Sequence, residues 1–184
     1  MGDVYPDFIV GFSNRFTYKN FTLSFTLDWR KGGIIYSETV QGLRVLGLAE
    51  ETLANREGGF IDREAYIEQA DGSLIENNIP VNVQDFWGRY SSGLIAEGNV
   101  FDASFIKLRE IGIAFSVPEN LLKNTPIRGI SVGLEARNPF LLYSKIPHID
   151  PETNLFGSAN DGAGIEFNSP PTSRSIGANI KISF

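Results

Sequence analysis

The sequence predicts an all-β fold of antiparallel, up-and-down strands, and two observations support that prediction. Several stretches alternate apolar and polar residues one by one, which is the side-chain period of a β-strand. The connections between these stretches are alternately short and long along the chain. We expect strands at about 7–17, 21–30, 102–116, 127–137 and 173–184.

The first two strands form a predicted hairpin because only a few residues separate them. In the second strand, large apolar residues alternate strictly with polar ones, at Phe21, Leu23, Phe25, Leu27 and Trp29. The first strand has a similar apolar face, interrupted by Asn14 and formed by Phe8, Val10, Phe12 and Phe16. The chain ends on another such face, formed by Ile176, Ala178, Ile180, Ile182 and Phe184.

Two long connections are expected, at 31–101 and 139–171, whereas the other two connections are tight. Outer-membrane barrels have short periplasmic turns, long extracellular loops and an apolar outer face bordered by aromatic residues. Aromatic residues stand near both ends of the apolar faces, at Phe16, Phe21, Phe115 and Phe184 on the short-turn side and at Phe8, Trp29, Phe105 and Phe140 on the long-loop side. The pattern favours a transmembrane β-barrel.

Five strands do not close a membrane barrel, for which about eight is the practical minimum. We therefore expect residues 1–184 to be the C-terminal, five-strand segment of a much larger barrel, with two long extracellular loops. The alternative from another class is a soluble β-sandwich that acts as a carbohydrate-binding module, because its strands also alternate.

The third and fourth predicted strands are less regular. In the third strand, Lys107 and Arg109 fall in phase with apolar residues, where a cation facing lipid costs roughly 2–4 kcal/mol. Either the first half of that strand lies above the membrane, or a β-bulge near Arg109–Glu110 exchanges the two faces. In the fourth strand, Asn138-Pro139 is expected to end the alternation.

The first long connection shows no two-faced alternation, but it contains three local patterns. Residues Ser37–Leu48 and Val83–Tyr90 have the spacing of short helices. Residues Tyr66–Glu76 contain Asp71-Gly72, the dipeptide preferred in a type I′ hairpin turn. So long a connection predicts a small subdomain or a functional loop.

The composition argues against several classes of function. A net charge of −6 argues against nucleic-acid binding, which needs clustered Lys and Arg. The chain has no Cys, and its single histidine, His148, makes a zinc site or a catalytic triad unfavourable. We expect no catalytic residues, no cofactor and no metal.

Four carboxylates are candidates for chemistry. Asp150 and Glu152 could act as paired carboxylates of a glycosidase. With Pro151 between them in a Gly/Asn-rich connection, a structural turn is favoured. Asp161 and Glu166 could supply oxygen atoms to calcium, but their spacing matches no EF-hand and the site is not favoured.

Two further groups of residues could contact a substrate. The charged residues of the polar strand faces are expected to pair with each other or with a plug, and they are Asp28, Arg30, Glu135, Arg137 and Lys181. The aromatic residues of the first long connection could stack on sugars or pack under a lid, but a small core of their own is favoured; they are Tyr66, Phe86, Trp87 and Tyr90. Trp87 and Tyr90 are the candidates for substrate contact.

Short motifs along nearly the whole chain resemble the C-terminal end of SusC/RagA-type TonB-dependent outer-membrane transporters of Bacteroidetes. The motifs are Pro6-Asp-Phe-Ile-Val-Gly-Phe-Ser-Asn14, Leu27-Asp-Trp-Arg-Lys-Gly-Gly33, Asn99-Val-Phe-Asp-Ala-Ser-Phe-Ile-Lys-Leu-Arg-Glu110, Ala136-Arg-Asn138, Asp150-Pro-Glu152 and the terminal aromatic. Their order and spacing together carry the resemblance. One departure is Lys145-Ile-Pro-His-Ile-Asp150, where the family usually has an aromatic before the proline.

The resemblance implies active import of large nutrients, typically oligosaccharides or peptides, across the outer membrane of a Gram-negative bacterium. It implies as partners a SusD-like lipoprotein that acts as a lid, TonB as the energy source, and the plug and remaining barrel. The plug and the part that contacts TonB would belong to regions upstream of this segment, which would supply wall and loops in the lipid bilayer. The resemblance also places Phe184 in the signal read by the barrel-assembly machinery.

Overall fold

A computed structural model describes residues 2–90, 95–155 and 162–184. The chain folds into two compact units. The first comprises Met1–Ile35, Asp102–Thr153 and Pro170–Phe184, and the second comprises Tyr36–Phe101 and Asn154–Ser169. In the described ranges, no helix is long and apolar enough to span a membrane.

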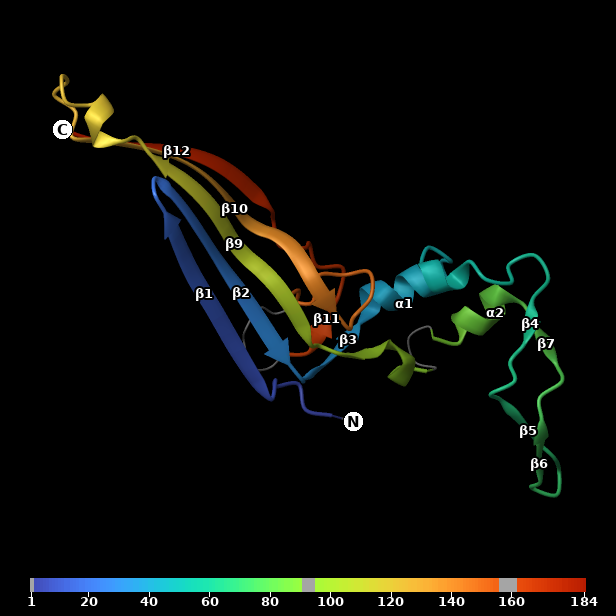
Figure 1. Cartoon of the computed structure of the whole chain (residues 1–184). Coiled ribbons are helices and arrows are strands. Elements are labelled where there is room, and N and C mark those ends of the chain that lie inside the picture. Colours follow the sequence, from blue (N-terminus) through green and yellow to red (C-terminus); the bar gives the residue numbers. More distant parts are fainter. Residues whose placement is uncertain (1, 91–94, 156–161) are drawn as a thin grey trace. The chain divides into compact units, whose positions relative to one another are not determined.

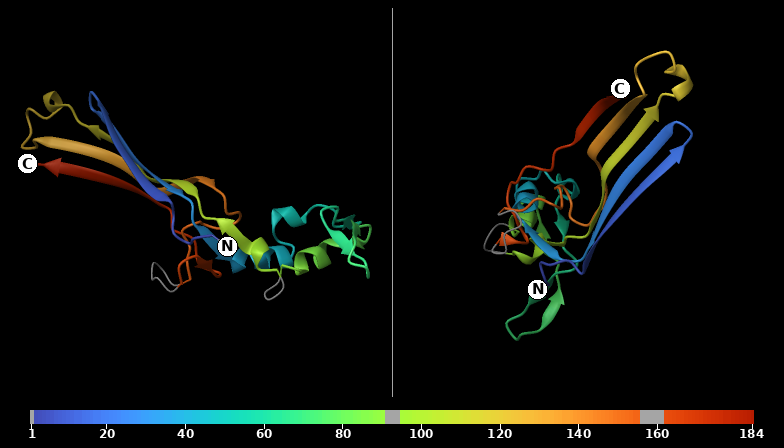
Figure 2. Two further views of the ribbon diagram at one scale, coloured as in Figure 1. Left: turned by 90° about the horizontal axis from the view of Figure 1, so that it is seen from below. Right: turned by 90° about the vertical axis from the view of Figure 1, so that its left-hand side faces the viewer.

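The first unit is a five-stranded antiparallel sheet of order β1-β2-β9-β10-β12 (Figures 1 and 2). Its strands are β1 (Phe8–Tyr18), β2 (Phe21–Lys31), β9 (Phe105–Ser116), β10 (Gly129–Ser144) and β12 (Ser175–Ser183). The order along the sheet follows the order along the chain, so each strand lies beside the next long strand. The connections β2–β9 and β10–β12 therefore leave the same end of the sheet, opposite the tight turns.

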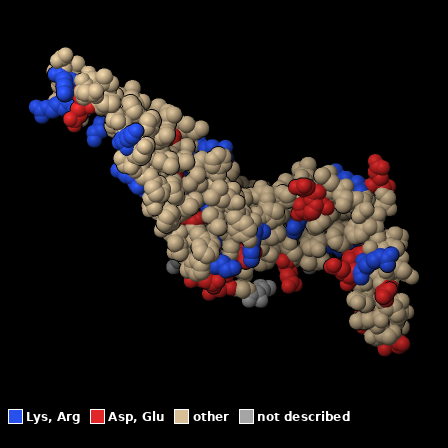
Figure 3. Space-filling view, in the orientation of Figure 1, with Lys and Arg blue, Asp and Glu red and all other residues tan. Residues whose placement is uncertain are grey.

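One face of this sheet is apolar and exposed across all five strands. Cross-strand rows continue the face from β1 to β10; one such row joins Phe16, Leu23, Ile113 and Leu134. The interruption at Asn14 is bordered by aromatics, because Phe25 opposite it lies 6.0 Å from the Phe12 ring and 6.3 Å from the Phe16 ring. Uncharged surface dominates the view of these strands in Figure 3.

A β-bulge at Arg109 settles the placement of the two cations in β9. Thr26 of β2 pairs with Glu110 and Leu27 pairs with Leu108, so Arg109 is an extra residue without its own partner on β2. The extra residue exchanges the faces of β9. Lys107 consequently pairs with Asp28 on the polar face, and Leu108 continues the apolar face.

Two predictions are corrected near Arg109, where β10 has a bulge of its own against β9. The fourth strand does not end at Arg137, because β10 continues through Asn138-Pro139 to Ser144. Asn138 adopts a φ of 48°, and the two residues together oppose Arg109, where Pro need not donate to the ladder. Phe105 does not belong to the exposed aromatic set: it pairs with Arg30 and is buried.

Other strand ends differ from the predictions by a few residues. Asp102 belongs to a separate strand, β8 (Val100–Asp102), and β9 starts only at Phe105. The second long connection starts after Ser144, and its part up to β12 contains the short strand β11 (Ile165–Glu166). One-turn 3₁₀ helices occupy Glu50–Thr52, Glu97–Asn99 and Glu119–Leu121.

The second unit contains most of the first long connection. It includes α1 (Glu38–Val45), α2 (Val83–Gly88), β4 (Phe60–Ile61) with β7 (Pro80–Val81), and β5 (Tyr66–Glu68) with β6 (Leu74–Glu76). The strand β3 (Ile34–Ser37) leads into α1 and pairs in parallel with β11 through Tyr36 and Ser37. Both predicted helices are confirmed. Ser37 caps α1 by accepting a hydrogen bond from the Val40 backbone N–H at 3.1 Å.

The hairpin predicted around Asp71-Gly72 is confirmed as β5–β6, but its turn is of another type. Gly72 has a φ of 81°, whereas Asp71 is not in the left-handed region that a type I′ turn requires at both central residues. The Gly72 N–H donates to the Gln69 carbonyl, and the Gln69 N–H donates to the Ser73 carbonyl. This arrangement is the three-residue hairpin loop with a glycine bulge.

Candidate functional site

The most concentrated set of charges in the first unit lies on the polar face of its sheet. The ammonium group of Lys107 donates to Asp150 Oδ2 at 3.0 Å, to Glu152 Oε2 at 2.6 Å and to Thr172 Oγ1 at 2.6 Å. The Lys107 side chain is only 3% exposed. A cation this deeply buried requires such partners, because desolvation strongly disfavours its charged form.

Arg109, the bulge residue, extends this set of charges. Its Nε donates to Asp28 Oδ2 at 2.5 Å, and both terminal nitrogens bind the carboxylate of Glu152. Such a two-pronged contact is the strongest common geometry between a guanidinium and a carboxylate. We call Asp28, Lys107, Arg109, Asp150, Glu152 and Thr172 the ion cluster.

The ion cluster closes the neck of the second long connection. Asp150 and Thr172 stand on either side of that connection, and the Thr172 backbone N–H donates to Asp150 Oδ2 at 3.1 Å. The Thr172 hydroxyl also binds the Asp150 carboxylate. A cavity of about 340 Å³ lies beside this neck and is lined by Lys107, Asn138, Leu141, Ile149, Asp150, Thr172 and Arg174.

The protonation of the two loop carboxylates argues for a structural role. Burial raises the pKa of Asp150, but hydrogen bonds from Thr172 and Lys107 outweigh it, so the pKa lies below its ordinary value. Burial likewise raises the pKa of Glu152, but hydrogen bonds from Arg109 and Lys107 outweigh this effect, so this pKa also lies below its ordinary value. A glycosidase needs one carboxyl group held protonated as the acid. Neither group is suited to that task, and both instead act as anchors.

The ion cluster goes beyond what the sequence predicts, although the sequence singles out most of its members. Asp150-Pro-Glu152 has the pattern of a turn, and Lys107 and Arg109 stand out as irregularities of a strand. One signal in the sequence could have predicted the cluster. Two cations, Lys107 and Arg109, break the alternation of β9, and the second long connection carries two carboxylates that could neutralise them. Of the other polar-face charges, Arg137 and Glu110 form an exposed pair at 3.6 Å, and Arg30 donates to the Val4 carbonyl.

Trp87 and Tyr90 lie together in an aromatic cluster of the second unit. Their ring centroids are 5.4 Å apart, and Phe86 contacts both rings. The guanidinium of Arg44 stacks over Trp87 at 5.2 Å and also bonds to Glu51. All three aromatic side chains are half-buried, and the Tyr90 carbonyl accepts from the side chains of Gln41 and Asn99.

Tyr66 lies outside this aromatic cluster and is 64% exposed. The cluster therefore has the character of a small core for the connection. Substrate contact by Trp87 and Tyr90 stays a prediction.

Glu166, a candidate calcium ligand by sequence, is fully buried in the second unit. It accepts hydrogen bonds from Ser37 Oγ at 2.5 Å, Thr39 Oγ1 at 2.6 Å and the Ser169 backbone N–H at 3.2 Å. Asp161 lies outside the described residues. Among the residues that are described, no group of His, Cys, Asp and Glu side chains has the arrangement of a metal site.

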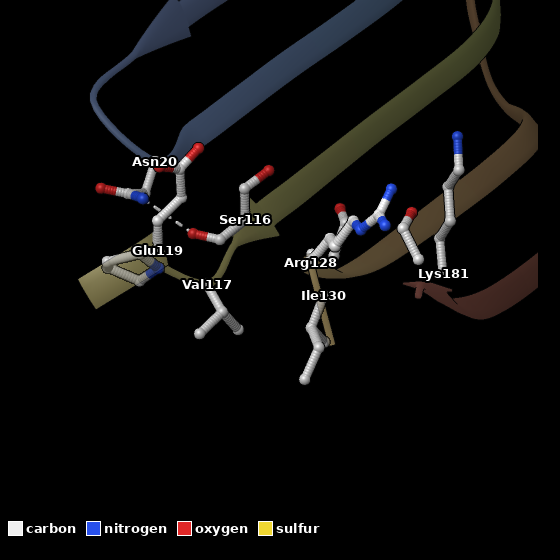
Figure 4. Close-up of a pocket in the computed structure, with 11 residues that line it drawn as sticks. Asn20, Ser116, Val117, Glu119, Arg128, Ile130 and Lys181 are labelled. Carbon is white, nitrogen blue, oxygen red and sulfur yellow. Dashed lines mark hydrogen bonds between the residues drawn. The ribbon is translucent and has the colours of Figure 1, made fainter. Parts of the chain in front are cut away.

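A shallow hollow of about 390 Å³ lies at the short-turn end of the sheet (Figure 4). Asn20 Nδ2 donates to the Ser116 carbonyl at 2.8 Å on one side, and Arg128 and Lys181 lie on the other. Lys and Arg gather toward this end in Figure 3. Both cationic side chains are exposed.

The fold and the ion cluster define a mainly β, antiparallel protein whose polar face anchors a long connection. Over its whole length the chain is homologous to part of the TonB-dependent receptors. It is 25% identical over 187 residues to TonB-dependent receptor P3 of Formosa agariphila and 28% identical over 191 residues to TonB-dependent receptor P26 of the same bacterium. The matches cover 98% and 100% of this chain. No family model matches the chain.

Solved structures give the same fold. The chain aligns with part of the RagAB peptide importer in its closed-closed state with a TM-score of 0.65 and 21% identity. For the open-open state the TM-score is 0.61 at 20% identity. Each alignment covers 98% of this chain and no more than 18% of the solved chain. The chain likewise spans 17% and 18% of the length of the two Formosa receptors, which are named as receptors rather than enzymes.

Proposed function

We propose that this chain forms part of the wall, and two of the extracellular loops, of an outer-membrane transporter that imports large nutrients with energy supplied through TonB. The observation that carries the proposal is the exposed apolar face that runs across all five strands of the sheet. An apolar surface of this extent is costly in water but favourable against hydrocarbon. A β-sandwich needs a second sheet over that face, and the described residues provide none there.

The ends of this face support a membrane location. At the short-turn end, Phe21 and Phe115 lie with ring centroids 4.9 Å apart, and at the other end Phe8 packs edge-on against Trp29 at 4.9 Å. Aromatic residues at both levels are typical of the two interfaces of a barrel. The ion cluster then lies on the side of the sheet that faces the barrel interior. The homology to TonB-dependent receptors implies the outer membrane.

The transported class follows from resemblance rather than from a visible site. We infer peptides or oligosaccharides, and the RagAB structures of a peptide importer support the first of these. The proposed partners are the remaining barrel and plug, TonB, and a SusD-like lipoprotein comparable to the second component of the RagAB assembly. Phe184, exposed at the end of the apolar face, is the proposed assembly signal.

The experiment is a growth assay with the full-length receptor that contains this segment. A strain without the receptor gene is supplied with single peptide pools or oligosaccharides, and growth is compared with and without the restored gene. We expect restored growth on one substrate class, and its loss when TonB is also deleted. Growth that is independent of both the receptor and TonB on every substrate would contradict the proposal.

A further inference from the structure

The residues 60–81, which we call the arm, form two short antiparallel ladders in the second unit. The ladder β4–β7 pairs Phe60 with Val81, and the ladder β5–β6 pairs Tyr66 with Glu76 and Glu68 with Leu74 (Figure 1). Two-stranded ladders of this length have no second layer of their own to cover their faces. The side chains exposed on these faces therefore indicate which kind of surface the arm could bind.

The arm exposes large apolar residues on both faces of β5–β6, and the two most exposed ones share a face opposite Ile75, which is 44% exposed. Because Tyr66 and Leu74 occupy the same face of the ladder as Glu68 and Glu76, this face combines two apolar groups with two carboxylates. Tyr66 is 64% exposed and Leu74 is 65% exposed, and Ile79 nearby in the arm is 59% exposed. Tyr is among the residues enriched at the centre of protein interfaces, and Leu74 is its diagonal neighbour across the ladder.

The arm is also acidic. It carries five carboxylates and one guanidinium: Asp62, Glu64, Glu68, Asp71, Glu76 and Arg63. Acidic side chains stand beside uncharged ones on the arm in Figure 3. Carboxylates at this density repel the phosphate groups of a membrane surface, whereas a protein surface with Lys and Arg around an apolar pocket would complement them.

We propose that the Tyr66–Leu74 face of the arm docks the SusD-like lipoprotein, through an apolar pocket bordered by basic residues on that partner. The inference rests on the proposed function, which supplies such a partner. It adds the surface on this chain and the chemistry of the surface that meets it. The apolar pair supplies the buried contact area, and the acidic pair sets orientation and salt dependence.

The test measures the affinity of the purified full-length receptor for its SusD-like lipoprotein in detergent, as a function of salt. One variant combines Tyr66→Ala with Leu74→Ala, and a second combines Glu68→Lys with Glu76→Lys. The control combines Leu48→Ala with Leu53→Ala, which removes equally exposed apolar groups outside the arm. Because all these side chains are exposed, each variant should reach the outer membrane in normal amounts, which is checked first.

We expect both arm variants to bind the lipoprotein at least about tenfold more weakly than wild type, with the charge variant losing most of the salt dependence, and the control to bind normally. Unchanged affinity in both arm variants would overturn the inference, even if they bound vesicles containing lipopolysaccharide less well. A wild-type receptor that imports its nutrient but binds no such lipoprotein would also overturn it, while leaving the proposed import function intact.

Discussion

At the scale of single residues, Lys107 determines how the second long connection is held. Its ammonium group contacts Asp150, Glu152 and Thr172, which lie on both sides of the neck of that connection. Arg109, two residues further along β9, binds the carboxylate of Glu152 as well, and it also binds Asp28 on β2. These contacts are partly or fully buried, so they are less screened by salt than surface pairs.

Replacing Lys107 by Met should loosen the neck because it removes the cation bound to Asp150, whereas Glu152 keeps its contact with Arg109. Removing one partner of a buried pair typically costs about 3–5 kcal/mol, which corresponds to more than about 100-fold more frequent local opening. The measurement is hydrogen–deuterium exchange at the Thr153 and Thr172 amides of the full-length receptor, since both donate to Asp150. Lys123→Met, an exposed substitution in the β9–β10 connection, serves as the control. Unaltered protection in Lys107→Met would refute this role.

The same neck should open in acid. Because the folded structure lowers the pKa of Asp150 and Glu152, their contribution to stability is complete above the ordinary carboxyl pKa of about 4. It is lost as the pH falls below about 4, through the lowered values, when both groups take up protons. Limited proteolysis of the 145–174 connection between about pH 7 and about pH 3 tests this. Glu152→Gln should shift the onset of cleavage to higher pH, and equal cleavage at every pH would contradict the prediction.

At the scale of elements, the aromatic cluster fixes the path of the chain around Gly98. A methyl group at Gly98 would lie 2.0 Å from Tyr90 Cε1, so only glycine fits against this ring. The Gly98 carbonyl also accepts from Arg44, which stacks on Trp87. The helix α1, which contains Arg44, is thereby tied to the chain that follows α2.

Gly98→Ala should destabilise this cluster by about 1–3 kcal/mol because the ring of Tyr90 must move. The readout is amide exchange at Arg89 and Tyr90, which close the end of α2, and we expect it to accelerate about tenfold. Gly42→Ala is the matched control, since a methyl group there meets nothing within 4 Å and favours the helix. Equal exchange in the two variants would show that the packing at Gly98 is loose.

The long strands were predictable because apolar and polar residues alternate along them with the two-residue period of a β-strand. The continuation of β10 was not, because Asn138-Pro139 is a strong local breaker, and β10 accommodates it through a bulge in which both residues oppose Arg109 of β9. The ion cluster was hidden for a related reason. Glu152 follows Arg109 by 43 positions, and no local pattern reports a contact at that separation.

At the scale of the whole molecule, the sheet has an apolar face, a polar face and two edge strands, β1 and β12. Each edge carries backbone groups that could pair with further strands, which a closed barrel would supply. The central claim is that hydrocarbon covers the apolar face while the polar face looks into the barrel.

Site-directed spin labelling of β2 tests this claim most directly, and residues 1–184 contain no native Cys that would compete for the label. Leu23→Cys and Leu27→Cys place a nitroxide on the apolar face of the full-length receptor in bilayers. Thr22→Cys and Thr26→Cys place it on the polar face as matched controls. We expect dissolved oxygen, but not a water-soluble nickel reagent, to relax the nitroxides on the apolar face. The nitroxides on the polar face should not show this combination of results. Labels at positions 23 and 27 that are shielded from both reagents, as in a protein core, would contradict it.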